Sequence, residues 1–190
     1  QTCDLLIYLH GGAWVLGWNN HHRVLAAHIG KESQSCVLAV DYRLAPEHPY
    51  PAPLNDCLAV YDQLLDEGID PCHIVIAGDS AGGNLALALL ISLRNAGRVL
   101  PAAAVCISPM TDLACTGKTF HTSRDALLTP EFAMSMSRLY ANGRDVRRPL
   151  ISPLYGDVRG LPPLLIHAGG DEILLSDAER LADSAENSGV

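Results

Sequence analysis

The sequence has no excess of positive charge and no apolar run long enough to cross a bilayer. It contains 13 Lys and Arg against 21 Asp and Glu, a formal net charge of −8. Nucleic acids and anionic membrane surfaces are bound by basic faces, so neither is expected as a partner. The longest apolar run, LALALLISL at residues 85–93, is far short of the roughly 20 residues that a membrane-spanning helix needs. It predicts a buried core helix instead.

The cysteines lack the spacing of a disulfide framework or a metal site. None of the six forms a C-x-x-C pair, and none clusters with histidines at metal-ligand spacing. We therefore expect no zinc or other metal site and no cofactor. Most of the cysteines lie in apolar runs, which favours buried reduced thiols in a cytoplasmic protein. Their positions are Cys3, Cys36, Cys57, Cys72, Cys106 and Cys115.

The sequence also lacks an initiator methionine and a signal peptide. It begins inside an apparent strand and ends just after an apparent helix. We therefore expect it to be part of a longer domain that is truncated at both ends.

Apolar, β-rich runs alternate with helical patterns along the chain. Strands are predicted at 4–9, 36–40, 73–77, 102–107 and 163–168, and helices at 21–33, 54–67, 82–96, 130–142 and 175–187. This alternation predicts a single α/β domain over residues 1–190, with a mostly parallel sheet and helices on both faces. The runs LLIYL, VLAV and IVIA are typical of strands buried on both faces.

Two segments interrupt the alternation. Residues 41–53 carry four prolines and predict an ordered loop. Residues 109–162 are longer than a simple crossover needs, and connections of that length are often lids or binding loops. We expect a cap or lid insertion at 109–148. Ligands of open α/β sheets bind at the carboxyl ends of the strands, so the residues there are the candidates for function.

The predicted strand at 73–77 is followed by Gly78-Asp79-Ser80-Ala81-Gly82. This is G-x-S-x-G between a strand and a helix, where a sharp turn holds a serine hydroxyl clear of the sheet. Ser80 is therefore a candidate nucleophile, with an ordinary glycine-rich turn as the alternative.

The strand at 4–9 is followed by HGGAW at residues 10–14. A glycine-rich loop in this place can present backbone N–H groups to a developing oxyanion, and Ala81 supplies another N–H from the elbow. A plain turn is the alternative. His10 precedes the glycines, so we interpret it as a histidine that braces the loop rather than as a base.

Asp171 and Glu172 follow the strand at 163–168. A serine hydrolase of this fold has its residues in the chain order serine, acid, histidine, and both carboxylates respect that order. They are candidates for the acid, with helix-start carboxylates favoured by the macrodipole as the alternative.

Together these motifs resemble the hormone-sensitive-lipase-like esterases of the α/β-hydrolase superfamily. The matching blocks are HGGAW, DYRLAPEHPYPA, GDSAGGNLA, SPMTDL and LPPLLIHAGGDEILLSDA. They span nearly the whole chain, and the second block is the most specific to the family.

The resemblance implies an α/β-hydrolase fold and a set of site residues. The implied roles are nucleophile for Ser80, oxyanion-hole region for Gly11, Gly12, Ala13 and Ala81, and bracing of the site for Asp41, Tyr42, Arg43 and Glu47. Glu172 is favoured over Asp171 as the acid because the family shows D-x-L, and Glu172-Ile173-Leu174 keeps that leucine spacing. Trp14, Trp18 and residues 109–148 are candidate pocket walls, with core packing as the alternative for the two tryptophans. Met110 is expected in the core.

The required histidine is missing after the acid. The last of the eight histidines is His167, which precedes Glu172, and none of the eight is a strong candidate. Typical element lengths put the base roughly 25–30 residues after the acid. We therefore expect it beyond Val190, and little turnover from residues 1–190 alone.

The predicted function is that of a serine carboxylesterase or lipase-like hydrolase. It would act on short-to-medium acyl esters of small molecules through a Ser-Glu/Asp-His triad and an acyl-enzyme. The full-length protein is expected to form a homodimer, as members of the resembled family often do. The alternative is a non-catalytic small-ligand receptor similar to the gibberellin receptors, which keep the serine and lack the histidine.

Overall fold

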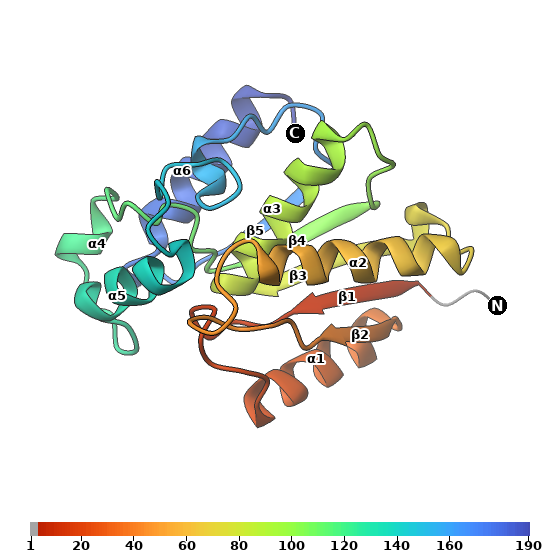
Figure 1. The fold of residues 1–190 in the computed structure, drawn as a ribbon, viewed down its shortest axis with the longest axis horizontal. Coiled ribbons are helices and arrows are strands. Elements are labelled where there is room, and N and C mark those ends of the chain that lie inside the picture. Colours follow the sequence, from red (N-terminus) through yellow and green to blue (C-terminus); the bar gives the residue numbers. More distant parts are fainter. Residues whose placement is uncertain (1–3) are drawn as a thin grey trace.

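A computed structural model describes residues 4–190, which contain a five-stranded parallel sheet in the order β2-β1-β3-β4-β5 (Figure 1). The strands are β1 (Leu5–Leu9), β2 (Cys36–Val40), β3 (Ile74–Asp79), β4 (Ala103–Ile107) and β5 (Leu164–His167). The helices are α1 (Asn20–Ser33), α2 (Ala52–Asp66), α3 (Ala81–Asn95), α4 (Thr119–Thr122), α5 (Pro130–Ala141) and α6 (Leu175–Asn187), with 3-10 turns η1 (Pro71–His73) and η2 (Pro153–Tyr155). The predicted α/β architecture is confirmed, and α4, η1 and η2 are additions to it.

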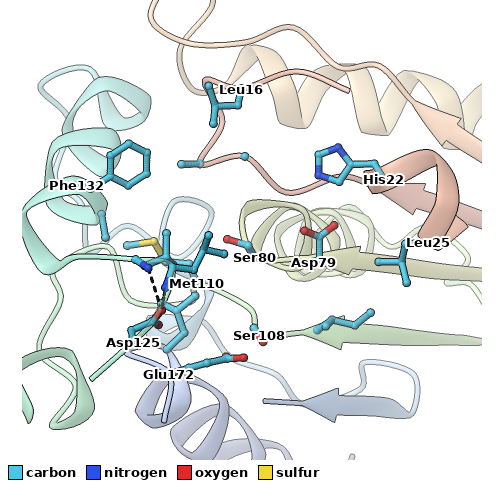
Figure 2. A pocket seen from close by; sticks show the side chains of 17 residues that line it. Leu16, His22, Leu25, Asp79, Ser80, Ser108, Met110, Asp125, Phe132 and Glu172 are labelled. Carbon is cyan, nitrogen blue, oxygen red and sulfur yellow. Dashed lines mark hydrogen bonds between the residues drawn. The ribbon is translucent and has the colours of Figure 1, made fainter. Parts of the chain in front are cut away.

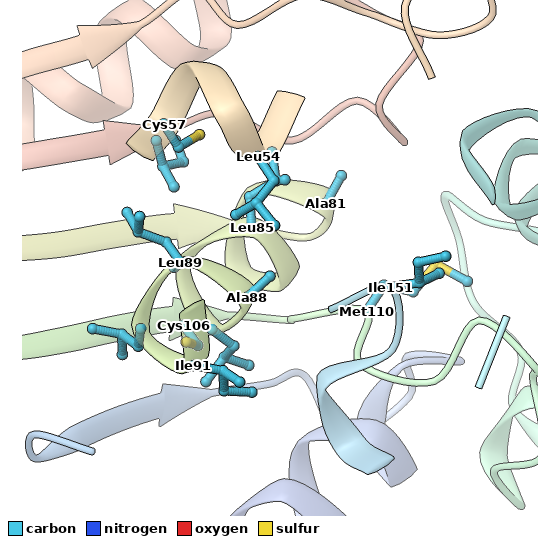
Figure 3. Packing of buried hydrophobic residues seen from close by; sticks show 14 of the residues in the cluster. Leu54, Cys57, Ala81, Leu85, Ala88, Leu89, Ile91, Cys106, Met110 and Ile151 are labelled. Atoms are coloured by element: carbon cyan, nitrogen blue, oxygen red, sulfur yellow. The ribbon is translucent and has the colours of Figure 1, made fainter. Parts of the chain in front are cut away.

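The two faces of the sheet carry separate cores, because helices cover both. α2 and α3 pack on one face and α1 on the other (Figure 1). The run predicted as a core helix lies in α3, where every residue from 85 to 91 is buried (Figure 3). A helix that is apolar on all sides must be surrounded, and each fully buried leucine stabilises the fold by about 1.5–3 kcal/mol. α3 therefore anchors the turn from which it starts.

The outer strand β2 departs from the prediction. VLAV was expected to be buried on both faces, but Leu38 and Ala39 are exposed because β2 pairs only with β1 among the described strands. Cys36, at the start of β2, is exposed for the same reason, and Cys72 is exposed in η1. Burial of these two cysteines was therefore a wrong prediction.

The other described cysteines follow the prediction. Cys57, Cys106 and Cys115 are buried, and Cys3 lies outside the described residues. No helix within residues 4–190 has both the length and the apolar composition that a membrane crossing requires.

Residues 109–148, the predicted cap or lid insertion, contain α4 and α5. The start of α5 is as the sequence predicts: the Thr129 side chain accepts the Phe132 N–H at 3.2 Å, and Pro130 occupies the first helical position. The role of the segment as a lid stays a prediction.

A buried carboxylate ties α6 to the chain that leaves β4. Asp177 is only 1% exposed, and its Oδ2 accepts the N–H groups of Thr111 at 2.7 Å and Asp112 at 2.8 Å. Burial raises the pKa of Asp177 to about 7, although the two N–H donors and Arg180 oppose the rise. Above pH 4 the unfolded chain therefore loses a proton that the folded chain keeps, and the free energy of unfolding falls until about pH 7.

Replacing Asp177 by asparagine should flatten this pH dependence. The amide oxygen of Asp177→Asn can still accept both N–H groups. An amide does not titrate, so the folded and unfolded chains no longer differ in the protons bound at this position. We expect the slope of unfolding free energy against pH between 5 and 6.5 to become less negative by up to about 1.4 kcal/mol per pH unit. Urea unfolding of the full-length protein at several pH values measures this slope. The control is Asp183→Asn, an exposed carboxylate of the same helix, and equal slopes in all three proteins would contradict the prediction.

Candidate active site

Ser80 lies at a sharp turn between β3 and α3. Its backbone has φ 52° and ψ −114°, a strained conformation for a residue with a side chain. Gly78 and Gly82 permit the turn: a Cβ at Gly82 would collide with the Leu9 carbonyl oxygen, and one at Gly78 with the backbone of Gly82. The Ser80 N–H donates to the Ile107 carbonyl at 2.8 Å, which fastens the turn to β4.

The loop after β1 borders the same cavity as Ser80. Gly12, Ala13 and Trp14 have φ values of 112°, 54° and 61°, and successive N–H groups in such conformations form anion-binding concavities. Gly12 and Ala13 line the same cavity as Ser80. Among the hydrogen bonds of residues 4–190, none uses the N–H of Gly12 or Ala13. The Gly11 N–H, in contrast, is already donated to a carboxylate.

That carboxylate belongs to Asp79, the last residue of β3. Its Oδ1 accepts the Tyr8 hydroxyl at 2.6 Å and the Gly11 N–H at 2.9 Å. Burial and the neighbouring Asp79 raise the pKa of Tyr8 well above its usual range, so the phenol remains a donor. A Cβ at Gly11 would collide with Oδ2 of Asp79. Asp79 therefore fixes the loop against the turn that carries Ser80.

His10 braces the loop from the other side, in agreement with the role predicted for it. Its Nδ1 donates to the Gly11 carbonyl at 2.6 Å, and its ring stacks on Tyr42 at 4.2 Å between centroids and 8° between planes. The Tyr42 hydroxyl donates to the His10 carbonyl at 2.5 Å. Burial lowers the pKa of His10, so the ring is neutral at pH 7. It supports the loop through packing and its hydrogen bond to Gly11.

The other residues predicted to brace the site lie further out. Arg43 pairs with Asp56 of α2 at 2.7 Å, which holds the proline-rich loop to that helix. Asp41 and Glu47 are exposed, and their side chains form no hydrogen bond within residues 4–190.

The two candidate acids differ in position. Glu172 lines the cavity with Ser80, whereas Asp171 is exposed and does not. Oε2 of Glu172 is buried and has no hydrogen-bond partner within residues 4–190, and the carboxylate packs over Gly169, where a Cβ would stand 2.7 Å from Oε1. Glu172 therefore presents an unused acceptor beside the cavity.

A cavity of about 560 Å³ joins these groups. Its polar lining consists of His22, Asp79, Ser80, Ser108, Asp125 and Glu172. Its larger apolar lining residues are Leu16, Leu25, Ile107, Met110, Leu127, Leu128, Phe132 and Leu174. In Figure 2, Ser80 and Asp79 project into the cavity from the turn, and Phe132 faces them from α5. Residues 4–190 contain no group of three or more His, Cys, Asp or Glu side chains placed to hold a metal ion.

Three large side chains near the cavity pack against the core of the protein. Met110 is buried in the hydrophobic core, as expected, and it also lines the cavity. Trp14, a candidate wall, is fully buried and stacks on Tyr140 of α5 with centroids 4.4 Å apart. Trp18, the other candidate wall, packs against Tyr8 at 5.9 Å and is not among the lining residues.

Comparison with known proteins places this geometry in a family. A family model described as alpha/beta hydrolase fold matches residues 6–190. The chain belongs to this α/β-hydrolase family. The predicted fold is thereby confirmed.

Named relatives of this α/β-hydrolase are ester hydrolases. The chain is 48% identical over 193 residues to an acetyl-hydrolase of Streptomyces hygroscopicus and 41% identical over 194 residues to an esterase of Acinetobacter venetianus. Both alignments cover 100% of this chain and 64% of the relative. The chain therefore spans slightly less than two thirds of the length of these relatives.

Solved structures similar to this chain also include esterases. An esterase from the bacterial hormone-sensitive lipase family has a TM-score of 0.96 and 48% identity, covering 98% of this chain and 64% of that one. A structure of EstE5 with PMSF has a TM-score of 0.94 and 46% identity, covering 100% and 64%. The resemblance to hormone-sensitive-lipase-like esterases is confirmed.

A serine nucleophile on the α/β-hydrolase fold is paired with a histidine base. Within residues 4–190, His22 is the one histidine that lines the cavity. Its Nδ1 accepts the Asn19 N–H at 3.3 Å as part of the α1 capping box, so the neutral ring carries its proton on Nε2. That nitrogen has no lone pair with which to take a proton from Ser80.

Sequence analysis overlooked two carboxylates of the site. Asp79 could have been found, because a charged residue at the carboxyl end of an apolar strand lies where ligands bind. Asp125 gave no such signal, because its hydrogen-bond partner Ile173 is 48 residues further along the chain.

Removal of the Asp79 carboxylate should destabilise the fold. Asp79→Ala leaves the buried Tyr8 hydroxyl and the Gly11 N–H without an acceptor, which costs about 1–3 kcal/mol for each group. We expect the unfolding free energy of the full-length protein to fall by about 2–4 kcal/mol, and Asp79→Asn, whose amide oxygen can accept both bonds, to lose less than half of that. Urea unfolding measures both variants, and equal losses would show that the hydrogen bonds are not the cause.

Proposed function

We propose that the full-length protein hydrolyses carboxylic esters of small molecules with Ser80 as the nucleophile. The observation that carries this proposal is the convergence on one cavity of the strained Ser80, the N–H groups of Gly12 and Ala13, and the carboxylate of Glu172. The names of the relatives, acetyl-hydrolase and esterase, support this chemistry over ligand reception without catalysis.

In the proposed reaction, Ser80 Oγ attacks the ester carbonyl carbon while its proton passes to a base. Negative charge develops on the former carbonyl oxygen, and the N–H groups of Ala81, Gly12 and Ala13 stabilise it. One such donor is worth about 10²–10³ in kcat. The tetrahedral intermediate expels the alcohol, which takes the proton from the base and leaves an acyl group on Ser80. Water then attacks the acyl carbon and gives a proton to the same base. The bond to Ser80 Oγ breaks, the carboxylic acid leaves, and the base returns the proton to Ser80.

The proposed base is a histidine of the full-length protein outside residues 1–190. The unpartnered Oε2 of Glu172 is a suitable acceptor for the ring N–H of that histidine, and it would stabilise the imidazolium formed when Ser80 loses its proton. The share of the relatives that this chain does not match leaves room for such a residue.

The proposed substrates are uncharged esters with short-to-medium acyl groups. The cavity of about 560 Å³ is walled by leucines, Met110 and Phe132, which favour apolar groups. Asp79 and Asp125 also line it, and these carboxylates would repel an acyl chain that carries its own negative charge.

Replacing Ser80 by alanine should abolish ester hydrolysis. We expect Ser80→Ala in the full-length protein to lower kcat/KM for p-nitrophenyl butyrate by at least about 10³-fold, because the covalent step is lost. PMSF, which sulfonylates activated serines, should label the wild type at Ser80. Ser108→Ala, which lacks the other serine of the cavity, should still be labelled. Labelling of Ser80→Ala at a different residue, with activity retained, would overturn the assignment.

The two candidate acids should respond differently to neutralisation. Glu172→Gln removes the charge that orients and stabilises the histidine, and we expect kcat to fall by about 10³–10⁴-fold. The exposed Asp171 is the matched control, and Asp171→Asn should stay within about threefold of the wild type. Steady-state kinetics on p-nitrophenyl butyrate measures both. The reverse ranking would exchange the two roles.

A further inference from the structure

Asp125 joins three backbone groups at the edge of the cavity. It lies between α4 and α5, and its Oδ1 accepts the N–H groups of Leu127 at 2.8 Å and Leu128 at 2.9 Å. Its Oδ2 accepts the N–H of Ile173 at 2.9 Å. Leu127 and Leu128 line the cavity, and Ile173 directly follows Glu172. One carboxylate thus connects the cavity wall to the loop that carries the proposed acid.

The same segment holds the other side of Ile173. The Thr119 hydroxyl donates to the Ile173 carbonyl at 2.8 Å and accepts the Ser176 N–H at 2.9 Å. The two peptide units that flank Ile173 are therefore both hydrogen-bonded to residues of the 119–125 segment. The Ile173 side chain is itself buried, so the residue next to Glu172 is fixed at its backbone and at its side chain.

The loop has little else to hold Glu172. Its own N–H reaches the Gly169 carbonyl at 3.3 Å, and its carbonyl accepts the Leu175 N–H at 3.3 Å. Both distances are long for N–H···O bonds. The bond from Ile173 to Asp125 is shorter and ends on a carboxylate, and bonds to ionised groups are about twice as strong as neutral ones. Burial raises the pKa of Asp125, but the three N–H donors outweigh it and lower the pKa overall, so this carboxylate is ionised at neutral pH.

We propose that Asp125 is a positioning residue that holds Glu172 in place for catalysis and links it to the Leu127–Leu128 wall of the cavity. This inference rests on the proposed function, in which Glu172 is the acid. With an uncharged ester as substrate, Asp125 acts on the reaction through Glu172, because its oxygens are engaged by backbone N–H groups.

The test uses Asp125→Asn in the full-length protein. An asparagine can keep one oxygen on Leu127 and Leu128, but its amide nitrogen then faces the Ile173 N–H, and two donors repel. The matched control is Asp145→Asn, because Asp145 is exposed and its Oδ1 accepts a single backbone N–H, from Arg147 at 2.9 Å. With p-nitrophenyl butyrate we expect Asp125→Asn to lower kcat by about tenfold or more with KM within about twofold, and Asp145→Asn to match the wild type.

A double-mutant cycle shows whether Asp125 acts through Glu172. If it does, adding Asp125→Asn to Glu172→Gln should change kcat by less than about twofold, because the group to be positioned is already disabled. A full tenfold further loss in that background would overturn the proposal, and so would wild-type kcat in Asp125→Asn. Should Asp125→Asn fail to fold, Thr119→Val takes its place, with the same expected pattern and the same overturning results.

Failure of this inference is distinguishable from failure of the proposed function. If Glu172→Gln is inactive while Asp125→Asn and Thr119→Val are fully active, the positioning role alone is wrong. If Glu172→Gln keeps wild-type kcat, the acid assignment is wrong and the positioning role falls with it. If Ser80→Ala keeps activity, the proposed function itself is wrong.

Discussion

Asp79 accepts hydrogen bonds from two groups that belong to a different strand and its following loop, the Tyr8 hydroxyl at 2.6 Å and the Gly11 N–H at 2.9 Å. β1 and β3 pair in parallel with Leu9 opposite Gly78, so the loop after β1 and the turn after β3 leave the sheet at neighbouring points. The Asp79 carboxylate holds this loop and this turn at a fixed distance from each other. The positions of the proposed oxyanion donors and of Ser80 relative to each other follow from it.

The strained turn at Ser80 persists because its surroundings determine it. A residue at φ 52° is unfavourable by about 1–3 kcal/mol and is retained only where other contacts hold it. Here those contacts are the buried helix α3 on one side and the bond from the Ser80 N–H to Ile107 on the other. The apolar run of residues 85–91 therefore has a second consequence besides stability, because it holds the hydroxyl of Ser80 at the edge of the cavity.

The features that could be predicted from the sequence are those encoded locally. Alternating apolar runs predicted every long strand and helix, and G-x-S-x-G predicted the sharp turn at Ser80. Exposure of Leu38 could not be read from VLAV, because it depends on which strand lies at the edge of the sheet. The cavity position of Met110 and the bond from Asp125 to Ile173 depend on how distant segments fold over the strand ends, and local patterns do not contain that information. The bracing role of His10 could be predicted because its ring donates to the adjacent Gly11 carbonyl, whereas its stacking on the distant Tyr42 could not.

In the proposed reaction, Ser80 and the N–H groups of the loop after β1 act on one substrate carbonyl. A crystal structure of the full-length protein inhibited with a p-nitrophenyl alkylphosphonate tests it most directly. We expect phosphorus bonded to Ser80 Oγ, with the phosphonyl oxygen about 2.7–3.1 Å from the N–H nitrogens of Ala81 and of Gly12 or Ala13. A phosphonyl oxygen turned away from these groups, or an adduct on a residue other than Ser80, would contradict it.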